Sequence, residues 1–223
     1  MGETESNILD RFTLKDIKEL ADQLGVAGLA GSIRRYTAST YQQFIDTLYS
    51  DLNSIVSTLQ ENPELRKDDG EDRLTLEILS ILRGMGYAAG HETKIGGHTD
   101  LSVRGKNNYL WIGEAKIHGS YDYLFQGFQQ LCTRYTTGDT NQDCGALIIY
   151  IKNKNCAAVV KEWRERITAQ GLTNLSISDC EDRPDFVFHT THTHERSGTP
   201  FNVKHIGISL YFNPQDKGKA PIP

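Results

Sequence analysis

Residues 97–116 read GHTDLSVRGKNNYLWIGEAK and contain two short apolar runs separated by a polar, glycine-containing turn at 105–108. A turn of this composition predicts two adjacent antiparallel strands. Antiparallel pairing would bring Asp100, at the start of the first strand, beside Glu114 and Lys116 at the end of the second. Because side chains two apart in a strand share a face, Glu114 and Lys116 should point the same way. Two carboxylates and one ammonium would therefore meet at one place.

The segments on either side of this hairpin predict an α/β domain. The apolar run 146–151 is uninterrupted and rich in β-branched residues, which is typical of a strand buried on both faces. We therefore expect the order α-β-β-β-α-β: a helix at 71–85, strands at 87–95, 99–103 and 109–114, a helix at 121–135 and the strand at 146–151. A helix near 157–169 and strands near 186–188 and 206–212 should follow.

The residues before this domain predict a helical module. Apolar residues recur at helical spacing after Thr13, a plausible N-cap, and again from about Thr40 to the end signal Glu61-Asn62-Pro63. Gly28, Gly31 and Ser32 should interrupt the helices. The predicted division is a helical module at 1–64, an α/β domain at 65–213 and a loose tail at 214–223.

The combination of Asp100, a hairpin spacer and Glu114-Ala115-Lys116 resembles the PD-(D/E)xK, or restriction-endonuclease-like, nuclease superfamily. The resemblance covers about residues 71–151, and Thr99 stands where the family name leads one to expect Pro. It implies a restriction-endonuclease-like core, in which helices flank a mixed central sheet. It also implies hydrolysis of phosphodiester bonds, with Asp100 and Glu114 holding Mg²⁺, for which Mn²⁺ could substitute, and with Lys116 serving the attacking water.

Two further residues are candidates because family members often draw support from the flanking helices. Glu71 lies about 35° from the centre of the apolar face of its expected helix and Glu77 about 85°, so Glu71 is the better-aimed additional metal ligand. An acidic residue favoured by the helix dipole is the alternative interpretation of Glu71. Some branches of the family use a Gln near a Tyr on the later helix. Gln130 resembles that feature, although Arg134 occupies the fourth position after it and Tyr135 the fifth.

The remaining candidates are histidines and basic residues. His118, two positions after Lys116, could line the cleft, and Arg134 could contact a phosphate. His189, His192 and His194 could bind Zn²⁺, which would create a separate metal-binding or regulatory domain. A solvated group of histidines at a loop or strand edge is the commoner outcome for such spacing.

Composition limits the class of protein and its partners. The net charge of −5 argues against coating nucleic acid by global electrostatics, so substrate binding should be confined to one local cleft. The acidic start, Met1–Glu5, lacks the pattern of a secretory signal, and no apolar run is long enough for a bilayer, so we expect a cytoplasmic protein without membrane contact. The resemblance implies DNA rather than RNA as substrate, and a role in bacterial or phage defence or restriction.

Two questions of partnership stay open. The N-terminal helices could bind DNA, form a homodimer or dock a regulatory protein. A non-catalytic interaction module that keeps the nuclease fold within a larger complex is the alternative to an enzyme.

Overall fold

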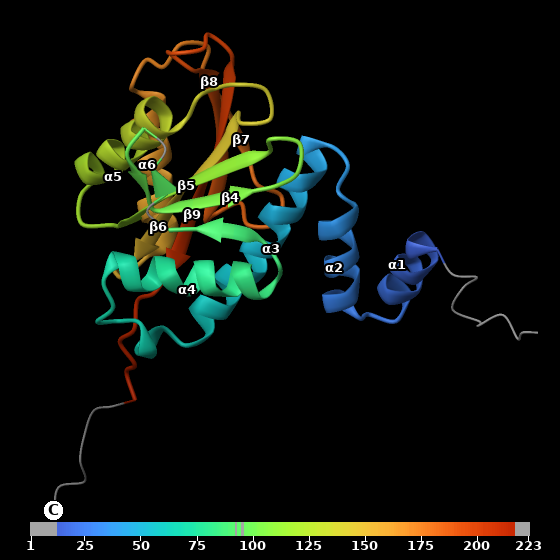
Figure 1. Ribbon diagram of the computed structural model, residues 1–223. Coiled ribbons are helices and arrows are strands. Elements are labelled where there is room, and N and C mark those ends of the chain that lie inside the picture. The colour runs from blue at the N-terminus through green and yellow to red at the C-terminus, as the bar shows by residue number, and fades with distance from the viewer. Residues whose placement is uncertain (1–12, 92, 95, 217–223) are drawn as a thin grey trace, which may run out of the picture. The chain divides into compact units, whose positions relative to one another are not determined.

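The computed structural model describes residues 13–91, 93, 94 and 96–216. The chain forms two compact units, Met1–Leu52 and Asn53–Pro223, and the division falls inside the long helix α3 (Tyr41–Glu61) (Figure 1). The boundary predicted from the sequence, between residues 64 and 65, comes after this helix.

The first unit begins with helix α1 (Leu14–Gln23), and Thr13 is its N-cap as predicted. The Thr13 hydroxyl accepts a hydrogen bond from the Asp16 backbone N–H at 3.2 Å, and the Asp16 carboxylate accepts one from the Thr13 N–H at 2.8 Å. This reciprocal capping box satisfies two N–H groups that the first helical turn would otherwise leave unpaired.

Helix α2 (Ala27–Thr37) corrects the prediction that Gly28, Gly31 and Ser32 interrupt the helices, because all three lie within it. A glycine inside a helix costs about 1 kcal/mol relative to alanine. Packing of α2 against α1 and burial of its Ala30 offset that cost, and the Ser32 hydroxyl donates to the Gly28 carbonyl at 2.9 Å. Tertiary packing here outweighs local propensity.

The second unit is an α/β structure built on a mixed sheet. Its helical segments are η2 (Pro63–Leu65), α4 (Glu71–Gly84), α5 (Tyr121–Gln129), the π-helical η3 (Gln130–Tyr135) and α6 (Cys156–Thr168). Its strands are β1 (Ala88–Gly90), β2 (Thr93–Lys94), β3 (His98–Thr99), β4 (Leu101–Arg104), β5 (Leu110–Ile117), β6 (Cys144–Ile151), β7 (Ser176–Asp179), β8 (Val187–Thr193) and β9 (Pro200–Ser209).

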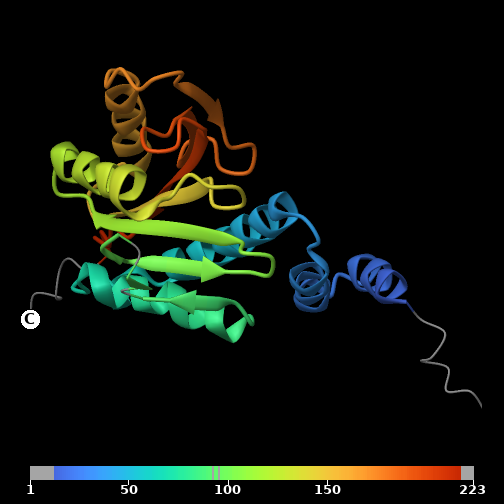
Figure 2. The same cartoon turned by 45° about the horizontal axis from the view of Figure 1, so that its top comes forward.

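Seven strands form the central sheet in the order β1-β4-β5-β6-β9-β8-β7. The pairs β5/β6 and β6/β9 are parallel and the others are antiparallel. Every residue of β6 is buried, as its apolar sequence predicts. Helix α4 lies on one side of the sheet, and α5 and α6 lie on the other (Figure 2). The expected mixed sheet flanked by helices is therefore confirmed.

Several details differ from the expected elements, among them the last strand, which was expected at 206–212 and is observed as β9 at Pro200–Ser209. The strand expected at 87–95 is split, because β1 joins the central sheet whereas β2 pairs with β3 in a separate two-stranded sheet. The expected helix at 121–135 ends as the π-helical η3. Strand β7 was not expected from the sequence, since it is short, polar and largely exposed at the sheet edge. Its place depends on pairing with β8, which its own residues do not reveal.

Candidate active site

Strands β4 and β5 bring Asp100 beside Glu114. Their antiparallel register pairs Leu101 with Gly113, so the residue before β4 meets the last part of β5. Strand β5 continues beyond this final pair, and the Ala115 N–H donates to Asp100 Oδ2 at 2.9 Å. The hairpin predicted from the sequence thus places the carboxylate of Asp100 at the free edge of β5.

Glu114 and Lys116 share one face of β5, as the alternation of side chains predicts. Lys116 Nζ lies 2.5 Å from Glu114 Oε1, and the two residues are 6% and 1% exposed, respectively. Ala115, between them, faces the other side and is fully buried. The ion pair is therefore removed from water. In this less polar environment its electrostatic interaction is stronger than it would be at the surface.

Glu71 reaches the same place from the first turn of α4. Its Oε2 accepts the Ile117 N–H at 2.7 Å, and its Oε1 lies 3.5 Å from Lys116 Nζ. Glu77 instead pairs with Arg66. The helical phase that distinguishes Glu71 from Glu77 in the sequence thus agrees with these contacts, and the N-terminal position on α4 also favours a negative charge.

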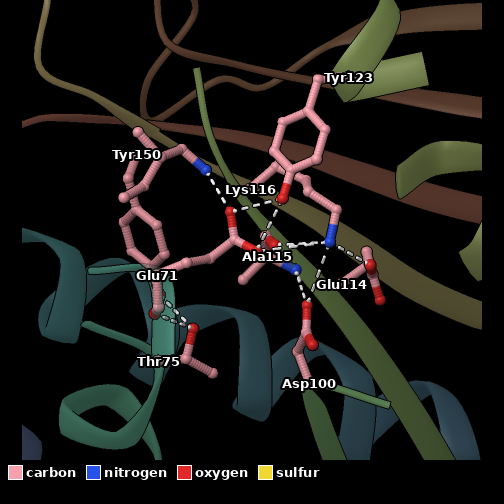
Figure 3. Close-up of polar contacts among 9 residues, drawn as sticks. Glu71, Thr75, Asp100, Glu114, Ala115, Lys116, Tyr123 and Tyr150 are labelled. Carbon is pink, nitrogen blue, oxygen red and sulfur yellow. Dashed lines mark hydrogen bonds and ion pairs between the residues drawn. The ribbon is translucent and has the colours of Figure 1, made fainter. Parts of the chain in front are cut away.

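Three carboxylates surround one ammonium in this cluster (Figure 3). Lys116 Nζ lies 3.7 Å from Asp100 Oδ2, in addition to its contacts with Glu114 and Glu71. Burial alone lowers the pKa of Lys116, but the three carboxylates outweigh it and hold that pKa above its ordinary value. Lys116 is consequently a permanent cation in this environment.

Glu114 has the most perturbed carboxyl group of the cluster. Burial, followed by the charge of Asp100, raises its pKa to about 7, although Lys116 acts in the opposite direction. Its Oε2 is buried and accepts no hydrogen bond from any residue that the structure describes. A buried polar atom without a partner is costly, so this oxygen is suited to receive a ligand.

Helix α5 contributes two residues that sequence reasoning missed. The Tyr123 hydroxyl donates to Glu71 at 3.3 Å, and the Tyr123 ring lies 5.5 Å from Lys116 Nζ. Burial, and then the charge of Glu71, raises the pKa of Tyr123, which keeps the phenol protonated as a donor. A Cβ added to Gly127 would come within 2.8 Å of Lys116 Cγ. The sequence of α5 carries no local signal for either residue, because their contacts depend on how α5 lies across β5.

Gln130 lies at the start of η3, beyond Gly127 on the same helical segment. Its side-chain oxygen is buried and has no hydrogen-bond partner among the described residues. Among the described residues, Gln130 makes no hydrogen bond to the carboxylates of Asp100, Glu114 or Glu71. Burial, and then the charge of Glu114, raises the pKa of Tyr135, so the end of η3 lies within electrostatic reach of the cluster.

His118 and Arg134 lie apart from the carboxylates. The His118 ring packs 4.9 Å from that of Tyr121, and burial lowers the pKa of the His118 imidazole. Arg134 is exposed beside the turn before β3, where a Cβ on Gly97 would lie 2.9 Å from Arg134 Cδ. Across the described residues, neither side chain forms an ion pair with the cluster.

Two histidines of the His189, His192 and His194 group do not form the solvated group that is the commoner outcome for this spacing. His192 and His194 are 4% and 1% exposed, so they are not solvated. His194 Nε2 is bonded to Thr136 Oγ1 at 2.9 Å and its Nδ1 to Ser197 Oγ at 2.9 Å. Throughout the described ranges, no group of three or more His, Cys, Asp or Glu side chains is arranged to hold a metal ion. His192 and His194 therefore lie within the packed interior.

The same finding applies to Asp100, Glu114 and Glu71 as they stand: Asp100 Oδ2 and Glu71 Oε2 each accept a backbone N–H, and Glu114 Oε1 contacts Lys116 Nζ. Comparisons with protein-family models, with curated proteins and with solved structures found no match.

Among the residues described, no helix has the length and apolar character needed to cross a membrane.

Proposed function

We propose that this protein is a metal-dependent nuclease that hydrolyses phosphodiester bonds through Asp100, Glu114 and Lys116. The observation that carries the proposal is the convergence of three carboxylates from separate elements on one buried lysine. A surface Glu-Lys pair in a hairpin would be neither buried nor joined by Asp100 and Glu71. Such a concentration of buried charge is unfavourable for folding and is typical of catalytic sites.

The donor set suits a hard divalent cation. When all four groups are charged, the three carboxylates and the one ammonium carry a net charge of −2. In addition, Glu114 Oε2 has no partner among the described residues. Mg²⁺ and Mn²⁺ prefer carboxylate oxygens and retain positions for water and phosphate. Asp100 and Glu114, with Glu71 in support, would hold the ion. When bound, the ion would lower the pKa of a coordinated water and stabilise negative charge on the phosphate.

Lys116 supplies the complementary positive charge. In the metal-free cluster the carboxylates hold the pKa of Lys116 above its ordinary value, so its ammonium is a hydrogen-bond donor there. An ammonium beside the carboxylates can orient a water molecule for in-line attack and stabilise charge that develops on a phosphate oxygen. The backbone amides of Ala115 and Ile117 hold Asp100 and Glu71 in place during that step.

The order of elements supports the same proposal. Helix α4, the central-sheet strands β1, β4 and β5, helix α5 and the parallel strand β6 follow the α-β-β-β-α-β order that the sequence resemblance implies, with β2 and β3 inserted as a separate pair. We infer a restriction-endonuclease-like core on this basis, with DNA as substrate. Sequence resemblance and topology are arguments about fold and class, so the substrate has to be tested directly.

The test is incubation of the purified chain with plasmid DNA, linear DNA and RNA, in Mg²⁺, Mn²⁺ or EDTA. We expect cleavage of DNA that requires metal and falls by at least about 10³-fold in Asp100→Asn and Lys116→Ala. Asp185→Asn and Lys161→Ala are matched controls, because these exposed residues carry the same charges on other parts of the chain, Asp185 before β8 and Lys161 on α6. The nuclease proposal would be overturned by absence of cleavage in every metal, or by equal cleavage in Lys116→Ala and the wild type.

A non-catalytic nucleic-acid-binding or scaffold module is the second candidate. The observation that favours it is that one oxygen of each carboxylate is already engaged, by Lys116 in Glu114 and by a backbone amide in Asp100 and Glu71. This candidate predicts DNA binding without cleavage, unchanged by EDTA and by Asp100→Asn. The same incubations, followed by gel-shift measurements, separate the two candidates.

A further inference from the structure

Tyr123 contacts two members of the cluster that come from different elements. Its hydroxyl lies 3.3 and 3.4 Å from the two carboxylate oxygens of Glu71 on α4, and its ring lies 5.5 Å from the ammonium of Lys116 on β5 (Figure 3). Tyr123 itself stands in the first turn of α5, which Ser120 caps. One side chain therefore joins two helices and a strand at this point.

We propose that Tyr123 is a positioning residue that fixes the Glu71 carboxylate and the Lys116 ammonium relative to each other, an inference that rests on the proposed nuclease function. Its hydroxyl supplies a neutral donor to Glu71, and its ring face supplies a favourable surface for the cation. These two contacts act on different groups, so they can be removed one at a time.

The cluster needs such a residue because its charges compete. Lys116 Nζ lies 2.5 Å from Glu114 but 3.5 Å from Glu71, so Lys116 pairs first with Glu114 and holds Glu71 less strongly. A second donor, the Ile117 N–H, fixes one oxygen of Glu71. Tyr123 completes the restraint from the opposite helix and prevents Glu71 from turning toward solvent.

The exposure of Tyr123 argues against a purely structural role. Tyr123 is 38% exposed, whereas Lys116, which its ring contacts, is 6% exposed. A partly exposed aromatic ring contributes less to the core than a buried one, so its removal should leave the fold intact. Changes in the cluster can then be measured without general unfolding.

The decisive measurement is the NMR signal of the Lys116 ammonium in protein labelled with ¹⁵N-lysine, in the absence of metal. A buried, ion-paired ammonium exchanges its protons slowly enough to be seen, and Lys116→Arg identifies the signal by its loss. We expect proton exchange to be about 3- to 10-fold faster in Tyr123→Phe and at least about 10-fold faster in Tyr123→Ala. Tyr121→Phe, on the same helix but packed against His118, is the matched control and should match the wild type.

Unchanged exchange rates in both Tyr123 variants would overturn the proposal, as would an equal change in Tyr121→Phe. In cleavage assays, Tyr123→Phe should lower kcat by about 3- to 10-fold and leave KM within about twofold, since the hydroxyl is proposed to position groups rather than bind substrate. If the wild type cleaves nothing, the nuclease proposal fails, while the ammonium signal still decides whether Tyr123 positions Lys116.

Discussion

The cluster around Lys116 and the histidines of β8 and β9 both contain buried ionisable groups, yet they are organised differently. In the Lys116 cluster, three carboxylates share one ammonium and one carboxylate oxygen has no partner among the described residues. In the sheet, His205 accepts from Trp163 Nε1 at 3.1 Å, bonds to Thr190 Oγ1 at 2.9 Å and stacks on Phe188 at 4.3 Å.

The two regions differ in the balance of charge between partners. Neutral partners satisfy His205 on both ring nitrogens, and burial holds its pKa well below the ordinary value, so it stays uncharged. The three carboxylates share a single ammonium, and this excess of negative charge is unfavourable unless another ligand joins the cluster. The contacts of His205 show that neutral hydrogen-bond partners can account for a fully buried imidazole.

The largest effect on stability should come from the histidine side of this comparison. His205→Ala removes a fully buried ring and leaves the Trp163 indole and the Thr190 hydroxyl without their partner. We expect the free energy of unfolding to fall by about 3–5 kcal/mol in urea denaturation. His98→Ala, at an exposed histidine, should change it by less than about 0.5 kcal/mol. A loss below about 1 kcal/mol in His205→Ala would contradict the structural role.

Glu114 should give the next largest effect, and it should depend on pH. With its pKa raised from 4.5 to about 7, folded Glu114 keeps a proton that the unfolded chain releases between these values. Wild-type stability in EDTA should therefore fall as pH rises from about 4.5 to about 7 by at most about 3 kcal/mol, and this contribution should be constant above pH 7.

Glu114→Gln tests this, because glutamine has no proton to lose. We expect its stability relative to the wild type to rise by about 1–3 kcal/mol between pH 5 and pH 8, measured by urea denaturation in EDTA. Parallel pH profiles for the two proteins would show that Glu114 is already ionised at pH 5, against the interpretation of a destabilised carboxyl group.

Gly127→Ala should have the smallest effect, and a direct steric cause. The added Cβ would lie 2.8 Å from Lys116 Cγ, so α5 or the lysine has to move. We expect a loss of about 1–2 kcal/mol together with faster exchange of the Lys116 ammonium protons. Gly84→Ala is the matched control, since this helical glycine has no atom within 4 Å of the new Cβ. It should stabilise the protein by about 0.5–1 kcal/mol.

Much of the cluster could be predicted because strand and helix periodicities are local properties. Alternation along β5 placed Glu114 and Lys116 together, the hairpin placed Asp100, and helical phase selected Glu71. Tyr123 could not be found in this way, because its contacts depend on how α5 lies across β5.

The fold shows the same limit. The order of elements followed from apolar periodicity, whereas the continuity of α2 through Gly28 and Gly31 depends on packing against α1. The π-helical η3, which begins at Gln130, has no local signature in the sequence either. Burial of the Gln130 side-chain oxygen depends on tertiary contacts.

The contacts of Ala115 and Ile117 have a consequence for aggregation. Beyond Gly113, β5 has no β4 residue beside it, and the N–H groups of Ala115 and Ile117 are satisfied by the carboxylates of Asp100 and Glu71. Unpaired strand edges attract strands from other molecules. Removal of both carboxylates would expose two adjacent donors at such an edge, so the acidic residues also keep this end of the sheet from associating with other chains.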